Sequence, residues 1–270
     1  MSDPESVIET ALLMQPLREP VLRFAIQALQ LPSGSRGLDA GCGIGLQSRL
    51  LFEAIGPAGS VTGLDSDLSS LDYAVEAADS AGLAGSVRFC QGDVNNIPFD
   101  DNTFDWAWSV DCVGYIPVDP LPMLRELVRV VRPGGMVAIL AWSSETLLPG
   151  YPLLEARLRT TTAGMAPYCK GSEPERHFLR SPGMFRKVGL VDRSAETFSE
   201  EACATLTDPL YRALSMLFGM RWKGAEQELE EEERVAFLRL TDPESEEFIL
   251  RHPDYYAFFT YSMFHGRVPQ

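Results

Sequence analysis

Residues 37–45, with the sequence GLDAGCGIG, constrain the fold of this chain most because they join a strand-like apolar run to a helix-forming stretch. Gly41, Gly43 and Gly45 alternate here, so the backbone can turn sharply and approach a ligand with no Cβ in the way. The helix that follows offers its unpaired N–H groups to a polar or charged group. Asp39 adds a carboxylate where the strand ends. The segment predicts a cofactor-binding loop, and an ordinary tight turn is the alternative.

Strand and helix patterns alternate after this loop. Strand-like runs at residues 36–40, 60–65, 87–92, 104–110 and 136–142 enclose helical patterns at 46–55, 68–81 and 121–131. Strands that alternate with single helices at this rhythm form a parallel, doubly wound sheet. In such sheets ligands bind beyond the carboxyl ends of the strands, where the winding reverses. The residues that end each strand are therefore the candidate binding residues.

The motifs that follow the loop resemble those of one enzyme family. Leu46 follows Gly45, so the loop reads D-x-G-x-G-x-G and not the G-x-G-x-x-G of dinucleotide-binding loops. Residues 99–105 (FDDNTFD) and 124–136 (LRELVRVVRPGGM) are similar to that family's later motifs. Over residues 36–143 the chain resembles the class I S-adenosylmethionine-dependent methyltransferases, in particular their small-molecule, UbiE-like (type 11) domains. The resemblance implies S-adenosylmethionine as the cofactor.

The same resemblance completes the expected architecture. It implies an α/β fold: a doubly wound, Rossmann-like, seven-stranded, mostly parallel sheet with an antiparallel last strand and a helical lid. Residues 181–189 look like the family's late helix, 191–198 like its sixth strand and 255–268 like its seventh.

The glycine loop and the ends of strands two to four supply the expected cofactor residues. In the loop these are Asp39, Gly41, Cys42, Gly43 and Gly45. Asp65 ends strand two, where a carboxylate can accept both ribose hydroxyls of a nucleoside, and Ser66 follows it. The alternative role for Asp65 is to cap the next helix, for which Asp67 is equally suited.

Gly92, Asp93 and Val94 follow strand three. Asp93 can accept from the exocyclic amine of adenine while the Val94 N–H donates to a ring nitrogen, as the family resemblance implies. A turn-forming aspartate beside Asn95 and Asn96 is the alternative.

The exit of strand four is expected to face the methyl group that is transferred. Ser109 is placed for a backbone contact with the methionine part of the cofactor, and Asp111, Cys112 and Tyr115 are candidates to contact the acceptor. A general base is needed if the acceptor is a hydroxyl or an acidic carbon, whereas positioning suffices for a thiol or an amine. A cap, a packing residue and a pocket wall are the structural alternatives for these three side chains, so the catalytic residue stays unassigned. The absence of an N-P-P-[YF] motif after this strand argues against N-methylation of bases or glutamine.

Segments outside the core pattern are expected to enclose a substrate. Residues 1–30 predict two helices, broken by Pro16 and Pro20, that cover the cofactor site. The core comprises residues 31–200 and 254–270, with an insertion at 144–180. Residues 201–253 predict a helical substrate lid. Aromatic side chains in and beside the insertions suit a flat or apolar molecule, or else core packing: Tyr151, Tyr168, Phe178, Tyr211, Phe218 and Trp222.

An acidic tract at residues 226–233 predicts a solvated helix face, with a site for a cation or a basic partner as the alternative. Arg234 and Arg239 follow it at the spacing of ion pairs within one helix.

The charge balance limits the partners. A net charge of -15 over 270 residues makes nucleic acids and anionic membranes poor partners, because such binders carry a basic face. No apolar run reaches bilayer length and no basic leader precedes one, so we expect a cytoplasmic protein that does not enter a membrane. The oligomeric state, monomer or homodimer, stays open.

Cysteine and histidine spacing argues against a metal site. The five cysteines form no C-x-x-C pair and the three histidines no H-x-x-x-H pair, so we expect reduced thiols and no structural metal.

Together these features predict an enzyme that transfers a methyl group from S-adenosylmethionine to a small-molecule acceptor by in-line displacement. A noncatalytic S-adenosylmethionine-binding module is the main alternative. A nicotinamide-dependent oxidoreductase is disfavoured by Leu46 and Asp93.

Overall fold

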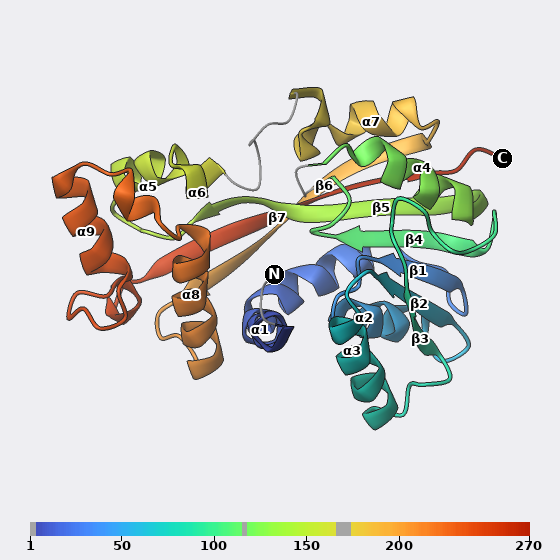
Figure 1. The fold of residues 1–270 in the computed structure, drawn as a ribbon, viewed down its shortest axis with the longest axis horizontal. Helices are drawn as coiled ribbons and strands as arrows, with labels where there is room; N and C mark the ends of the chain where they lie inside the picture. The colour runs from blue at the N-terminus through green and yellow to red at the C-terminus, as the bar shows by residue number, and fades with distance from the viewer. Residues whose placement is uncertain (1–3, 115–117, 166–173) are drawn as a thin grey trace.

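The computed structural model describes residues 4–114, 118–165 and 174–270, which contain a seven-stranded sheet with helices on both faces (Figure 1). The strands are β1 (Arg36–Ala40), β2 (Ser60–Asp65), β3 (Val87–Gln91), β4 (Phe104–Val110), β5 (Val131–Thr146), β6 (Val191–Cys203) and β7 (Tyr256–Arg267). Their order across the sheet is β3-β2-β1-β4-β5-β7-β6. β1 to β5 pair in parallel, whereas β7 runs antiparallel to both β5 and β6. The predicted sheet with its antiparallel last strand is confirmed.

Helices on the two faces bury separate parts of the core. They are α2 (Leu46–Ile55), α3 (Leu68–Ser80), α4 (Pro120–Val130) and α7 (Ser181–Lys187). Figure 1 places α2 and α3 on one face and α4 and α7 on the other. Leu50 and Leu51 of α2 belong to one buried cluster with Trp106 of β4, whereas Leu124 of α4 belongs to the other with Ala107. The winding reverses between β1 and β4, so the ends of these two strands mark the expected ligand position.

The N-terminal segment is one helix, α1 (Pro4–Ala28), so the expectation of two helices was wrong. Pro16 and Pro20 lie inside it, where each removes a backbone donor. Buried side chains next to the prolines, including Leu17 and Val21, pack α1 into the core, and this packing offsets the missing hydrogen bonds. Within the described parts of the chain, no helix combines the length and apolar character needed to cross a membrane.

The sheet is longer on one side than the sequence predicted. β5 runs from Val131 to Thr146 and β6 continues to Cys203, well beyond the predicted limits of 142 and 198. Figure 1 shows the ends of β5, β6 and β7 projecting away from β1–β3 and carrying a group of helices. We call this group the helical lobe; it contains α5 (Pro152–Arg159), α6 (Thr162–Met165), α8 (Asp208–Arg221) and α9 (Glu231–Thr241) with the short turns η3 (Ala225–Gln227) and η4 (Ile249–Arg251). Two further short turns, η1 (Pro174–Arg176) and η2 (Phe178–Arg180), precede α7.

Most of the predicted pocket aromatics belong to the core. Phe218 and Trp222 stack with ring centroids 5.8 Å apart inside the helical lobe, and Phe178 contacts Phe264 of the sheet edge-on. Tyr211 packs against the same lobe core, whereas Tyr151 is exposed. Tyr168 lies outside the described residues. These five described rings therefore form no common binding surface.

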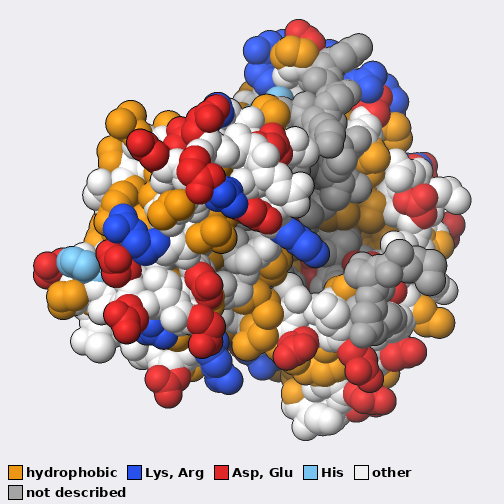
Figure 2. All heavy atoms as spheres, turned by 60° about the vertical axis from the view of Figure 1, so that its left-hand side comes forward, with side chains coloured by type: hydrophobic (Ala, Val, Ile, Leu, Met, Phe, Trp, Pro, Cys, Tyr) orange, Lys and Arg blue, Asp and Glu red, His pale blue; other side chains and the backbone are white. Residues whose placement is uncertain are grey.

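The acidic tract is largely exposed, as predicted, and only its last residues enter α9. Glu233 accepts from the Glu230 backbone N–H at 3.0 Å and caps the helix. Arg234 pairs with Glu231 inside α9, but Arg239 pairs with Glu247 beyond the helix, 3.4 Å away. Figure 2, which brings the left-hand side of Figure 1 forward, shows acidic side chains spread over much of this face.

Candidate functional site

The glycine loop is tied to the end of β2. The backbone N–H groups of Gly41 and Cys42 both donate to the Leu64 carbonyl, at 2.8 and 3.0 Å. Gly41 has a φ of +79°, and a Cβ there would lie 2.6 Å from the Cys112 Sγ. A Cβ on Gly43 would meet only open space. The loop is therefore fixed on its inner side and open at Gly43, where a ligand can approach the backbone.

The Asp65 carboxylate, at the end of β2, holds the glycine loop and the next turn through hydrogen bonds. Its Oδ2 accepts from the Gly43 N–H at 2.8 Å and its Oδ1 from the Asp67 N–H at 3.0 Å. Asp67 is the residue that caps α3, because its side chain accepts from the Ser70 N–H at 2.9 Å. The capping role considered for Asp65 thus belongs to Asp67, and the ribose contact of Asp65 stays a prediction. Ser66 is exposed beside them.

The turn after β3 holds Asp93 at the surface. Asp93 Oδ1 accepts from the backbone N–H of Asn95 at 2.8 Å and from its side-chain amide at 2.9 Å. The backbone bond, followed by the side-chain bond, lowers the pKa of Asp93. The Gly92 N–H donates to the Asp65 carbonyl at 2.9 Å, which places this turn next to the end of β2, and Val94 is buried below it. The turn role of Asp93 is observed; its contact with adenine stays a prediction.

Two of the polar residues expected to bind the cofactor have buried side chains. Asp39 is 1% exposed and its Oδ2 accepts from the Ser48 Oγ of α2 at 2.6 Å. Ser109 is equally buried, and its Oγ accepts from the Val113 N–H at 3.3 Å. Both side chains therefore point into the protein interior and support the backbone of the site. Their contacts with a cofactor stay predictions.

Asp39 should make the stability of the protein depend on pH. Burial, opposed by the Ser48 bond and supported by the charge of Asp65, raises its pKa to about 7. The unfolded chain loses this proton near pH 4, so the free energy of unfolding falls as the pH rises toward 7 and stays lowered above it. We expect Asp39→Asn, which keeps an acceptor for Ser48, to reduce the fall between pH 5 and pH 8 by roughly 3 kcal/mol. Urea denaturation of both proteins at the two pH values measures it, and equal falls would contradict the assignment.

The exit of β4 carries a cluster that the sequence revealed only in part. Asp111 has a φ of +48°, and its Oδ1 accepts from the Trp142 N–H at 3.0 Å. Its Oδ2 accepts from the Arg18 Nη2 at 2.6 Å and from the Tyr261 hydroxyl at 3.0 Å. The Arg18 Nε also donates to the Tyr261 hydroxyl, at 2.9 Å. We call Arg18, Asp111 and Tyr261 the Asp111 cluster; it joins α1, the end of β4 and β7.

Cys112 and Tyr115 are the other two candidates to contact the acceptor. Cys112 is half-buried against Gly41, and burial, with the nearby charge of Asp65, raises its pKa to about 11. The thiol is thus protonated near neutral pH and is not a nucleophile. Tyr115 lies outside the described residues. Of the candidates that the structure describes, Asp111 has the most suitable polar surroundings.

A cavity of about 620 Å³ opens at the Asp111 cluster. α1 and α8 supply most of its apolar wall, through Val7, Ala11, Met14, Leu217 and Met220. Trp142 and Tyr261 line it from the sheet, and Arg221 and Lys223 from the end of α8. The cavity lies next to the glycine loop because Asp111 is followed by Cys112, which packs on Gly41. None of the lining residues from α1 and α8 was identified from the sequence as a site residue.

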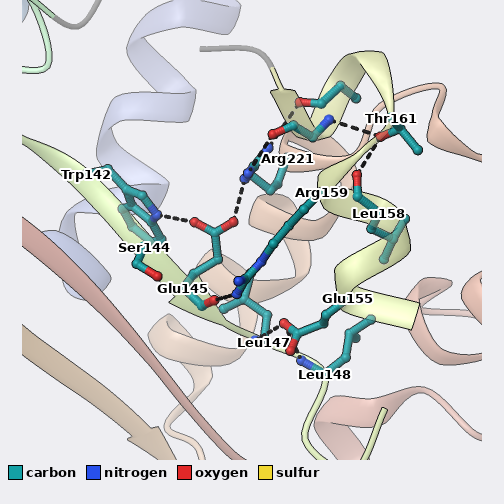
Figure 3. Close-up of polar contacts among 12 residues, drawn as sticks. Trp142, Ser144, Glu145, Leu147, Leu148, Glu155, Leu158, Arg159, Thr161 and Arg221 are labelled. Atoms are coloured by element: carbon teal, nitrogen blue, oxygen red, sulfur yellow. Dashed lines mark hydrogen bonds and ion pairs between the residues drawn. The ribbon is translucent and has the colours of Figure 1, made fainter. Parts of the chain in front are cut away.

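A buried ion pair supports the far end of this cavity (Figure 3). Glu145 accepts from the Trp142 indole N–H at 2.5 Å and from the Arg221 Nε at 2.9 Å. The two remaining Arg221 nitrogens donate to the carbonyls of Ala163 and Gly164, at 3.0 and 3.1 Å. Because these charges are almost fully buried and fully hydrogen-bonded, they fix Trp142 and Arg221 in place.

Comparison with known proteins gives the site a chemical context. A family model described as "Methyltransferase domain" matches residues 38–135. The demethylmenaquinone methyltransferase of Geobacillus sp. (strain WCH70) is 31% identical over 185 residues, which cover 64% of this chain and 78% of that protein.

Solved structures share the fold at lower identity. The YcgJ protein of Bacillus subtilis superposes with a TM-score of 0.58 at 17% identity, covering 93% of this chain and 99% of that one. Phosphoethanolamine N-methyltransferase 2 of Haemonchus contortus, solved with S-adenosyl-L-methionine, gives a TM-score of 0.52 at 18% identity, covering 92% of this chain and 52% of that one.

Proposed function

Because this chain belongs to the class I S-adenosylmethionine-dependent methyltransferases, we propose that it methylates a small-molecule acceptor held in the cavity between α1 and α8. The observation that carries the proposal is the position of Asp111, which lines the cavity and is followed directly by the residue that packs on the glycine loop. A molecule in the cavity would therefore meet the methyl donor at the Asp111 cluster. The acidic surface of the chain supports a small molecule over a nucleic acid as the acceptor.

The ends of β1, β2 and β3 are the proposed cofactor site. Asp65 would accept from the ribose hydroxyls, Asp93 and the Val94 N–H would bind adenine, and the open corner at Gly43 would receive the cofactor against the backbone. Bound S-adenosylmethionine supplies the methyl group and leaves as S-adenosylhomocysteine. The buried Asp39 and Ser109 would support this surface and make no direct side-chain contact.

The Asp111 cluster is the proposed acceptor-activating group. Asp111 would accept the proton of an acceptor hydroxyl or acidic carbon as the new bond to the methyl carbon forms. Arg18 and Tyr261 would hold the carboxylate in one orientation, because both donate to its Oδ2. The apolar wall would exclude water and align the acceptor with the methyl group.

A substitution that fills part of the cavity tests this proposal. Ala11 lines the cavity from α1, so Ala11→Phe would fill part of it, whereas Ala28→Phe adds the same ring to an exposed position of the same helix. We expect Ala11→Phe to abolish turnover of the acceptor identified in a small-molecule screen with labelled S-adenosylmethionine. Ala28→Phe should keep it.

Calorimetric titration with S-adenosylhomocysteine, with NAD as the control ligand, should show unchanged binding in both variants and none of NAD. Full turnover by Ala11→Phe would place the acceptor elsewhere. A failure to transfer methyl groups to any acceptor class, with S-adenosylhomocysteine still bound, would support the noncatalytic alternative.

A further inference from the structure

We infer that the acceptor is an amphiphilic anion: an apolar or aromatic body with a carboxylate or phosphate group at the end remote from the reacting atom. This inference rests on the proposed function, since it concerns the occupant of the same cavity. It is carried by the charges that line the cavity and by their separation along Trp142.

The charge of the cavity is opposite to that of the chain. The chain has 23 basic and 38 acidic residues, so an average part of its surface is acidic. Among the described residues that line the cavity, however, Arg18, Arg221 and Lys223 are basic and Asp111 alone is acidic. Because Arg18 and Arg221 are paired with Asp111 and Glu145, the excess amounts to one positive charge, that of Lys223. A positive group at the edge of an apolar cavity favours a ligand that is apolar at one end and anionic at the other.

Two of the three cations that line the cavity are paired with a carboxylate of the described residues, and one is not. Arg18 pairs with Asp111 at 2.6 Å, and Arg221 pairs with Glu145 at 2.9 Å. Lys223 is exposed and forms no ion pair with any residue in the described ranges. The uncompensated charge therefore lies at the end of α8, two residues beyond the fixed guanidinium of Arg221.

Trp142 separates the two ends of the cavity. Its backbone N–H donates to Asp111 at 3.0 Å, whereas its indole N–H donates to Glu145, the partner of Arg221 (Figure 3). The indole ring is held flat against Phe259, with centroids 4.4 Å apart and planes 8° apart. The reactive end and the cationic end are thus one rigid aromatic residue apart. An acceptor that reaches both would lie along Trp142 with its anion toward Lys223.

Matched ligands test this assignment without knowledge of the natural acceptor. The full chain, saturated with S-adenosylhomocysteine, is titrated by calorimetry with 2-naphthoate, 2-naphthyl phosphate, 2-naphthylmethanol and 2-naphthylmethylammonium. We expect one or both anions to bind about tenfold or more tightly than the alcohol, and the ammonium compound to bind most weakly. The two anions distinguish a carboxylate subsite from a phosphate subsite.

A charge reversal locates the subsite. Lys223→Glu should remove the preference for the anions, whereas Lys187→Glu, which makes the same change at an exposed position of α7, should keep it. Equal binding of all four compounds, a preference for the ammonium compound, or equal effects of the two variants would overturn the inference. The parent protein is first titrated with S-adenosylhomocysteine alone. If S-adenosylhomocysteine does not bind, the proposed function is contradicted. If it binds and the protein shows no preference for the anions, this inference alone is contradicted.

Discussion

Asp65→Ala is expected to weaken the binding of S-adenosylhomocysteine by roughly a hundredfold or more, because hydrogen bonds to a charged group contribute about 1.5–3 kcal/mol each and two ribose hydroxyls would lose theirs. The carboxylate also accepts from the Gly43 N–H at 2.8 Å, so its removal loosens the open corner of the glycine loop. Both effects act in the same direction. Calorimetric titration of the purified variant measures the change directly.

Asp67→Ala is the matched control, since it removes an aspartate two residues away. Asp67 caps α3 and does not contact the loop through its side chain. Loss of the cap should cost about 1 kcal/mol of stability and leave the affinity for S-adenosylhomocysteine unchanged. Equal loss of affinity in both variants would mean that Asp65 acts through the fold of this turn. Unchanged affinity in Asp65→Ala would contradict the ribose assignment.

The sheet could be predicted because its signals are local. β1, β2 and β4 have the predicted limits, since each is a short run with apolar residues in its interior, bounded by turn residues. The same holds for α2, which begins at Leu46, directly after the left-handed Gly45. The two prolines led to the wrong prediction of a break in α1. The helix continues through them because the burial of one of its faces against the core outweighs the loss of two backbone N–H donors.

The acceptor side of the site could be predicted only in part because its contacts join distant segments. Asp111 was a candidate through its place after β4, but its partners Arg18 and Tyr261 lie 93 and 150 residues away in the sequence. No local pattern marks an arginine inside a helical repeat or a tyrosine inside a strand as members of one cluster. Glu145 and Arg221 pose the same problem, since their pairing depends on how far β5 extends beyond the core.

Asp111→Asn should lower kcat for the acceptor found in the screen by about 10²–10⁴-fold, the usual contribution of a general base. The asparagine keeps an oxygen to accept from the Trp142 N–H, so the cavity wall should be retained, but it cannot take up the acceptor proton. The affinity for S-adenosylhomocysteine should not change, because the carboxylate faces the cavity and not the predicted ribose and adenine sites.

Tyr261→Phe separates proton transfer from orientation. Tyr261 would act only by holding the carboxylate, so its loss should cost roughly tenfold in kcat, the lower end of the effect of one hydrogen bond to a charged group. Asp111→Asn, in contrast, removes the proton acceptor itself and should cost the larger factor of about 10²–10⁴ in kcat. The kcat values of the parent and the two variants, with thermal unfolding as the check on folding, make the distinction. If Asp111→Asn kept the kcat of the parent, the acceptor would need no base, and the cluster would serve to position an amine or thiol that attacks unaided.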